Sequence, residues 1–199
     1  MPARRPRILI VNGALAGATG NTGVLLDRAA RSLARRASVS QLALAEGGEF
    51  TTVRAELERA DGFLIGTGTH WDSWSSVLQA FLEEATPAEG TALWLGKPAA
   101  VVVTEHSVGG KGVLSRLQGV LVTLGCALPP MGGLVLSRAA VLAAKHEPEA
   151  ARDFWCADDL AVVCHNLVEA AAIRAGRRTP ARWRTWPVDR RDFGARWLG

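Results

Sequence analysis

The chain of 199 residues is 48 % hydrophobic, enough for one core, and its longest apolar runs are too short for a membrane span. Its net charge of +4 is uneven: the segment from Arg174 onward holds eight arginines and two aspartates, and the rest holds 15 basic and 17 acidic residues. We therefore expect a soluble protein with no membrane or nucleic-acid partner. No long apolar region follows the basic N-terminus, which favours the cytoplasm.

Hydrophobic periodicity predicts five strands that alternate with helices. The strands are expected at residues 7–11, 39–44, 63–66, 99–104 and 134–136. Helices are expected from Thr22, after a cap at Thr51 and Thr52, over residues 77–83 and 113–124, and from Asp153 to about Ala175.

This alternation predicts a parallel sheet with right-handed crossovers. We expect a three-layer, flavodoxin-like α/β fold whose five strands lie in the order 2-1-3-4-5, with the ligand at the carboxyl ends of strands one and three. The domain is expected over residues 1–176 and a basic, tryptophan-rich arm over 177–199. The arm either packs its indoles on the body or a second subunit, or contacts an anionic ligand or nucleic acid.

The three cysteines, Cys126, Cys156 and Cys164, are odd in number and form no Cys-x-x-Cys pair. This pattern argues against a disulfide framework, a zinc site and an iron–sulfur cluster. We expect three buried, unreactive thiols and no metal. Structural roles are also expected for His146, on a charged loop, and for His165, while Asp158 and Asp159 are expected on a solvated helix face.

The loop after the first strand is rich in glycine and opens a helix. Glycines let successive amides converge, and the helix N-terminus adds positive partial charge, so the loop suits a phosphate. Thr19, Asn21 and Thr22 add hydrogen-bonding side chains. The glycine spacing matches neither a P-loop nor the G-x-G-x-x-G fingerprint. An ordinary strand–helix connection is the alternative.

Two further loops follow the third and fourth strands: residues 68–73, which lead into the helical pattern 78–83, and Thr104 with Gly109 and Gly110. Together with the first loop, they make the chain resemble the NADPH-dependent FMN reductase family from about residue 7 to residue 136. Gly20, Asn21 and Thr22 resemble the Gly-Asn-Thr of that superfamily's phosphate loop. Residues 68–73 and 78–83 are similar to its Pro-x-Tyr-x-x-Ser and Leu-Lys-x-Phe-hydrophobic-Asp motifs. Thr104, with Gly109 and Gly110, resembles the third loop, which lines the flavin ring.

The resemblance implies non-covalent FMN, NADPH or NADH as co-substrate, a small electron acceptor such as a quinone or flavin, and a homodimer or homotetramer. It implies no catalytic side chain, because the cofactor carries the hydride chemistry. The implied cofactor-binding residues are Ala18, Thr19, Gly20, Asn21, Thr22 and Gly23 at the phosphate, and Gly68, Thr69, His70, Trp71, Asp72, Ser73, Thr104, Glu105, His106, Gly109 and Gly110 around the ring.

Several positions depart from the family pattern. Gly68 stands for proline, His70 for tyrosine and Gln79 for lysine, and residues 14–17 replace the usual serine and arginine of the first loop. Trp71 is expected to stack on a planar ring or to be a surface indole. His70 is expected to donate to a flavin carbonyl, to supply a proton or to fill the loop. An electron carrier without its own substrate, and a fold that has lost its flavin, are the alternative functions.

Overall fold

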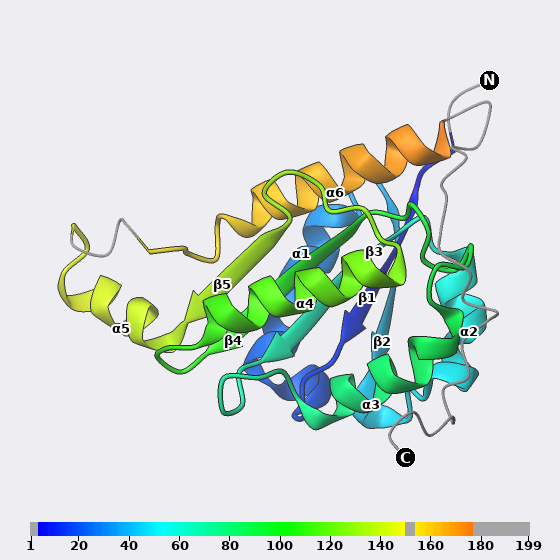
Figure 1. Cartoon of the computed structure of the whole chain (residues 1–199). Helices are drawn as coiled ribbons and strands as arrows, with labels where there is room; N and C mark the ends of the chain where they lie inside the picture. The colour runs from blue at the N-terminus through cyan, green and yellow to red at the C-terminus, as the bar shows by residue number, and fades with distance from the viewer. Residues whose placement is uncertain (1–3, 150–153, 177–199) are drawn as a thin grey trace, which may run out of the picture.

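Five parallel strands form the central sheet of the computed structural model, which describes residues 4–149 and 154–176 (Figure 1). The order along the sheet is β2-β1-β3-β4-β5, as predicted. The strands are β1 (Arg7–Asn12), β2 (Ser38–Ala43), β3 (Gly62–Gly68), β4 (Ala99–Glu105) and β5 (Gly133–Ser137). The arm expected at 177–199 lies outside the described residues.

Helices cover both faces of the sheet and complete the three layers. One face carries α2 (Phe50–Arg59), α3 (Ser76–Ala85) and α4 (Gly110–Leu124), whose buried residues join one core cluster. The other face carries α1 (Asn21–Leu33) and α6 (Leu160–Ala175), which build a second cluster. Three short 3-10 turns are η1 (Gly17–Thr19), η2 (Leu44–Glu46) and η3 (Thr86–Ala88).

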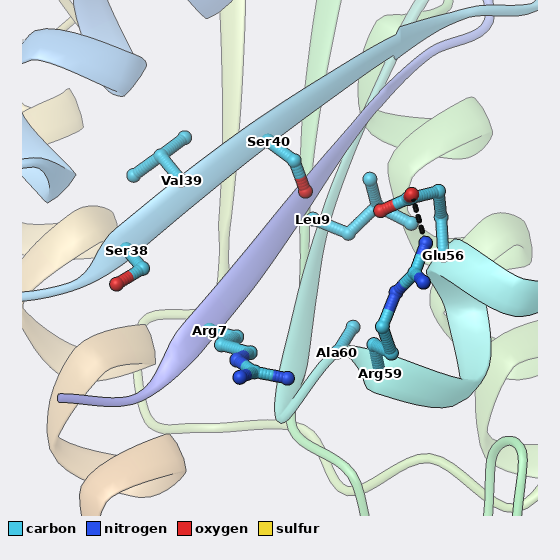
Figure 2. Close-up of a pocket in the computed structure, with 8 residues that line it drawn as sticks. All are labelled: Arg7, Leu9, Ser38, Val39, Ser40, Glu56, Arg59 and Ala60. Atoms are coloured by element: carbon cyan, nitrogen blue, oxygen red, sulfur yellow. Dashed lines mark hydrogen bonds and ion pairs between the residues drawn. The ribbon is translucent and has the colours of Figure 1, made fainter. Parts of the chain in front are cut away.

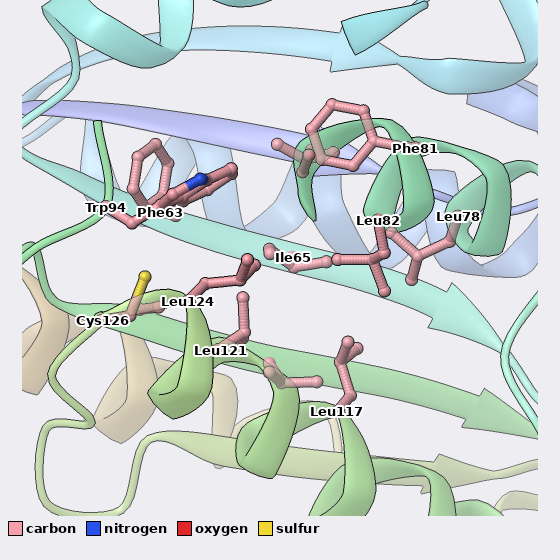
Figure 3. Packing of buried hydrophobic residues seen from close by; sticks show 14 of the residues in the cluster. Phe63, Ile65, Leu78, Phe81, Leu82, Trp94, Leu117, Leu121, Leu124 and Cys126 are labelled. Atoms are coloured by element: carbon pink, nitrogen blue, oxygen red, sulfur yellow. The ribbon is translucent and has the colours of Figure 1, made fainter. Parts of the chain in front are cut away.

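Aromatic residues anchor the first cluster between the sheet and its helices (Figure 3). The Trp94 indole is 1 % exposed, and its ring centroid lies 5.2 Å from that of Phe63. Phe50 packs edge-on against Phe81, with ring centroids 5.7 Å apart. Such rings bury a large apolar area, so this cluster fixes how α2 and α3 sit on the sheet.

Helices α2 and α6 begin at other residues than predicted. Helix α2 begins at Phe50, before the expected threonine cap, because the buried Phe50 ring holds the first turn and the Glu84 carboxylate accepts the Phe50 N–H at 2.9 Å. Helix α6 begins only at Leu160, since a turn in which Cys156 N–H donates to the Asp159 carboxylate precedes it. Asp158 and Asp159 therefore lie before the helix and not on its face. The expected helix start at Asp153 lies outside the described residues.

Helix α5 (Arg138–His146) was not predicted, and it places His146 on a helix end instead of a loop. Ala140 is its one buried residue among those described, and Val141 and Leu142 are exposed, so little of this helix packs on the core. In Figure 1 it extends from the end of β5, away from the central layers.

The cysteine prediction holds for two residues and is wrong for the third. Burial raises the pKa of the Cys126 thiol to about 12 and that of Cys164 to about 11. Cys156 is exposed, because it lies in the turn before α6. Across residues 4–149 and 154–176, no group of three potential metal-ligating side chains lies together. The same part of the chain contains no helix with the length and hydrophobicity of a membrane span.

Candidate functional site

The carboxyl ends of β1, β3 and β4 bring the three predicted loops into contact. Gly13 N–H, after β1, donates to Gly66 O of β3 at 2.8 Å, and Thr69 N–H donates to Thr104 O at the end of β4 at 2.8 Å. The fully buried Ser75 hydroxyl donates to Gly13 O and also caps α3. Parallel strands present their loops at one edge of the sheet, and here main-chain hydrogen bonds join them.

A pair of hydroxyl groups joins the first and third loops directly. Thr22, in the first turn of α1, is 2 % exposed, and its Oγ1 lies 2.7 Å from Thr104 Oγ1. The predicted phosphate loop and the predicted ring-lining loop therefore share one small region.

The first loop is shaped by its own backbone and by Asn12. The buried Asn12 amide donates to Gly17 O at 2.8 Å and accepts the Ala14 N–H at 3.1 Å. A Cβ on Gly23 would lie 2.3 Å from Ala18 O, so only glycine fits there. Among the described residues no side chain caps α1 at Gly20. The first amides of a helix have no intrahelical partner, so this N-terminus retains donors for an anion.

The second loop is a two-residue hairpin. His70 N–H donates to Ser73 O at 2.8 Å, and Ser73 N–H donates to His70 O at 2.9 Å. The two central residues, Trp71 and Asp72, have φ of 48° and 56°, which is the left-handed region of a type I′ turn. Trp71 is 102 % exposed, so the strained turn presents its indole to solvent.

Gly68 and His70, which replace the proline and tyrosine of the family pattern, lie next to each other in the structure. The His70 ring folds back over Gly68, where a Cβ would lie 3.3 Å from His70 Nε2 and 3.8 Å from Thr104 Oγ1. The absence of a side chain at position 68 therefore leaves space for the imidazole beside β4.

The third loop packs against the hairpin and begins α4. Gly109 has φ of +95°, a conformation that favours glycine, and a Cβ there would lie 2.1 Å from Asp72 Oδ1, so the Asp72 side chain would have to move. Glu105 Oε2 accepts the Gly110 N–H at 2.5 Å and caps the helix. His106 Nε2 lies 3.1 Å from an Arg138 guanidinium nitrogen, at the start of α5.

One polar atom of this region is unpaired. The Thr69 hydroxyl is buried and has no hydrogen-bond partner among the described residues. Buried hydroxyls are nearly always paired, so this hydroxyl has hydrogen-bonding capacity left for a water molecule or a bound group. The orphan hydroxyl, the uncapped helix start and the glycine-lined backbone fit a phosphorylated planar cofactor such as FMN.

A hollow of about 290 Å³ lies at the opposite end of the sheet (Figure 2). Arg7, Ser38 and Ser40 line it from β1 and β2, and Glu56 and Arg59, which form an ion pair, line it from α2. Because Arg7 and Ser38 are the first residues of their strands, this hollow is separate from the loops at the carboxyl ends.

Four residues that position these loops were not singled out from the sequence. Asn12 and Ser75 hold the first loop, Glu46 contacts it from η2, and Arg116 of α4 donates to the Asp72 carbonyl. Ser75 carries a recognisable signal, because serine before an apolar helix is a common N-cap. The other three act across the fold and carry no local signal.

The fold and the converging loops define a flavodoxin-like protein. Residues 6–141 match the model of the NADPH-dependent FMN reductase family, and the chain belongs to that family. The family identifies it as a flavoprotein oxidoreductase with FMN as its flavin. No curated protein matches the chain.

Solved structures with this fold include other flavin enzymes. RosB with bound 8-demethyl-8-formylriboflavin-5′-phosphate has a TM-score of 0.69 at 16 % identity and covers 84 % of this chain and 79 % of its own. The apo NADH:FMN oxidoreductase EMOB has a TM-score of 0.62 at 16 % identity, and the match covers 84 % of this chain and 89 % of EMOB. FerB, an NAD(P)H:(acceptor) oxidoreductase from Paracoccus denitrificans, has a TM-score of 0.56 at 19 % identity, and the match covers 83 % of this chain and 97 % of FerB. At these identities the likeness shows the fold alone.

Proposed function

We propose that this chain binds FMN non-covalently at the junction of its three loops and reduces a small acceptor with NADPH or NADH. The observation that carries the proposal is the contact between the loops: Thr22 of the first loop meets Thr104 of the third, and Thr104 O accepts the N–H of Thr69 in the second. The Thr69 hydroxyl itself has no hydrogen-bond partner among the described residues. When bound, FMN supplies the hydride chemistry, and the protein supplies binding, orientation and electrostatics.

Each loop has a separate task in this proposal. The uncapped start of α1, with Asn21 and Thr22, holds the phosphate through amides and polar side chains. The Thr69 hydroxyl and the His70 ring donate to polar atoms of the flavin. Trp71 offers an exposed planar face beside the ring.

The test is the visible spectrum of the purified protein. After incubation with FMN and removal of free flavin, the protein should be yellow, and anaerobic NADPH or NADH should bleach it. A quinone or free flavin added to the bleached protein should restore the colour. A protein that stays colourless after incubation with FMN contradicts the proposal.

The spectrum also tests the alternative hypothesis that the chain is an electron carrier without its own substrate. In that case the purified protein would be yellow, but neither NADPH nor NADH would bleach it. A dedicated carrier commonly docks through a strongly charged face of one sign, whereas the residues before Arg174 hold 15 basic and 17 acidic side chains. The near balance of charge favours the reductase.

We further propose a cytoplasmic homodimer or homotetramer without a nucleic-acid or membrane partner. Apolar side chains on α5 and the segment before α6 support an assembly, because Val141, Leu142, Phe154 and Trp155 are all 40–56 % exposed. Large apolar side chains that are left exposed are available for contacts between proteins. Light scattering of the purified chain at several concentrations gives the oligomeric state, and a monomer throughout would contradict this part of the proposal.

A further inference from the structure

A carboxylate contacts the first loop where the proposed function places the phosphate. Glu46 is the last residue of η2, after β2, and its Oε1 accepts the Ala18 N–H at 3.3 Å. A Cβ on Gly17 would lie 2.7 Å from the same oxygen, and Gly17 has φ of +52°. An anionic side chain of the chain itself thus occupies one of the donors that a phosphate would use.

The charge around this loop is negative. Residues 12–23 contain no lysine or arginine, and a hollow of about 250 Å³ beside Ala18 and Gly23 is lined by two carboxylates, Asp27 and Glu46. The Asp27 carboxylate accepts a hydrogen bond from Gln41 at 3.2 Å, which is a neutral partner. Of the described residues that line the hollow, the charged ones are all acidic. A phosphate on the loop would therefore meet like charge on its β2 side.

We propose that Glu46 sets the flavin preference of the site by opposing the phosphate. This inference rests on the proposed function. The carboxylate competes for the Ala18 N–H and repels a phosphate dianion, so the phosphate adds less to binding than an unoccupied loop would allow. Riboflavin, which lacks the phosphate, does not meet this repulsion. Glu46 thereby narrows the difference in affinity between FMN and riboflavin.

The experiment compares the dissociation constants of FMN and riboflavin, measured by quenching of flavin fluorescence, in the wild type and in Glu46→Gln. Removal of the charge should tighten FMN by roughly three- to tenfold and change riboflavin less than about twofold. Glu46→Lys should tighten FMN further. Glu49→Gln removes the same charge from an exposed residue three positions away and should change neither constant. Added salt should reduce the gain in FMN affinity, because the carboxylate is exposed.

The outcomes separate this inference from the proposed function. A ratio of the FMN and riboflavin constants that is unchanged in both Glu46 variants would overturn the inference while flavin binding stands. Equal tightening of both flavins would also overturn it, since that result indicates a change in loop shape and not in charge. Failure of every variant to bind either flavin would overturn the inference and the proposed function together. Circular dichroism and thermal melting check that each variant is folded.

Discussion

The Thr22 and Thr104 hydroxyl oxygens lie 2.7 Å apart although the two residues are 82 positions apart in the chain. One begins the helix after β1 and the other belongs to the end of β4. Their hydrogen bond spans β3, which lies between those strands in the sheet, and it brings the predicted phosphate loop to the predicted ring-lining loop.

Replacing either threonine by valine should lower the free energy of unfolding by about 1 kcal/mol, because one buried hydroxyl then loses its partner. The double variant Thr22→Val, Thr104→Val should be less destabilised than the sum of the single variants, since no unpaired hydroxyl remains. Urea unfolding of the four proteins measures this coupling. Additive single effects would show that the two hydroxyls do not interact.

Thr69→Val should leave the free energy of unfolding unchanged or raise it, because the buried Thr69 hydroxyl has no partner among the described residues. The same variant should weaken FMN by about 1 kcal/mol if that hydroxyl donates to the flavin. Thr67→Val is the matched control, since the Thr67 hydroxyl accepts the Ser75 N–H at 3.3 Å and its loss should lower stability. Unaltered FMN affinity in Thr69→Val would remove this residue from the site.

Gly23→Ala should lower the free energy of unfolding by about 1–3 kcal/mol, since the new Cβ would lie 2.3 Å from Ala18 O and overpack the loop. Gly119→Ala is the control in α4, where an added Cβ meets nothing within 4 Å. That variant should be more stable by about 0.5–1 kcal/mol, because glycine is a poor helix former. Thermal melting monitored by circular dichroism compares the two. Equal effects would mean that the first loop yields to the added methyl group.

Trp71→Gly should raise the free energy of unfolding by about 1 kcal/mol, because tryptophan adopts φ of 48° in the turn and glycine does so at little cost. The exposed indole loses no buried contact when it is removed. If Trp71 stacks on the flavin, the same variant should bind FMN more weakly. Urea unfolding and flavin titration measure the two effects, and a less stable variant would contradict the strain at this turn.

The buried position of Lys97 leads us to expect that the free energy of unfolding depends on pH in the alkaline range. Its ammonium group is buried and donates to Leu57 O at 2.7 Å and Glu58 O at 3.1 Å, at the end of α2. Burial, with a further effect of Arg174, lowers the pKa of Lys97 to about 8 from 10.5. Between pH 8 and pH 10.5, Lys97 is mostly protonated in the unfolded chain and mostly neutral in the folded one. The unfolded chain therefore binds more protons, and the free energy of unfolding rises with pH.

Relative to Lys97→Met, the wild type should gain about 2 kcal/mol of unfolding free energy between pH 8 and pH 10. Urea unfolding across this range gives the difference at each pH. Lys145→Met, at an exposed position of α5, should show no such gain. A wild-type curve parallel to that of Lys97→Met would mean that the Lys97 pKa is not lowered.

Much of the fold was predictable because its signals are local. Continuous apolar runs marked β1, β3 and β4, and alternation with helices predicted the parallel sheet and its strand order. Helix α5 was not predicted, although its nine residues include the apolar run 139–144; the helix is short and only Ala140 of its described residues is buried. The exposure of Cys156 also escaped prediction, since cysteine has the same hydrophobic character in a turn as in a core.

The sequence by itself determined which segments build the candidate site, because glycines and polar residues that directly follow a strand are recognisable from the local sequence. Only the tertiary structure decided how these segments meet. The contact of Glu46 with Ala18 joins residues 28 positions apart. That the Thr69 hydroxyl finds no partner among the described residues depends on every group packed around it. Hydrogen bonds and charge repulsion act over a few ångströms of space, so their partners are fixed by packing and not by order along the chain.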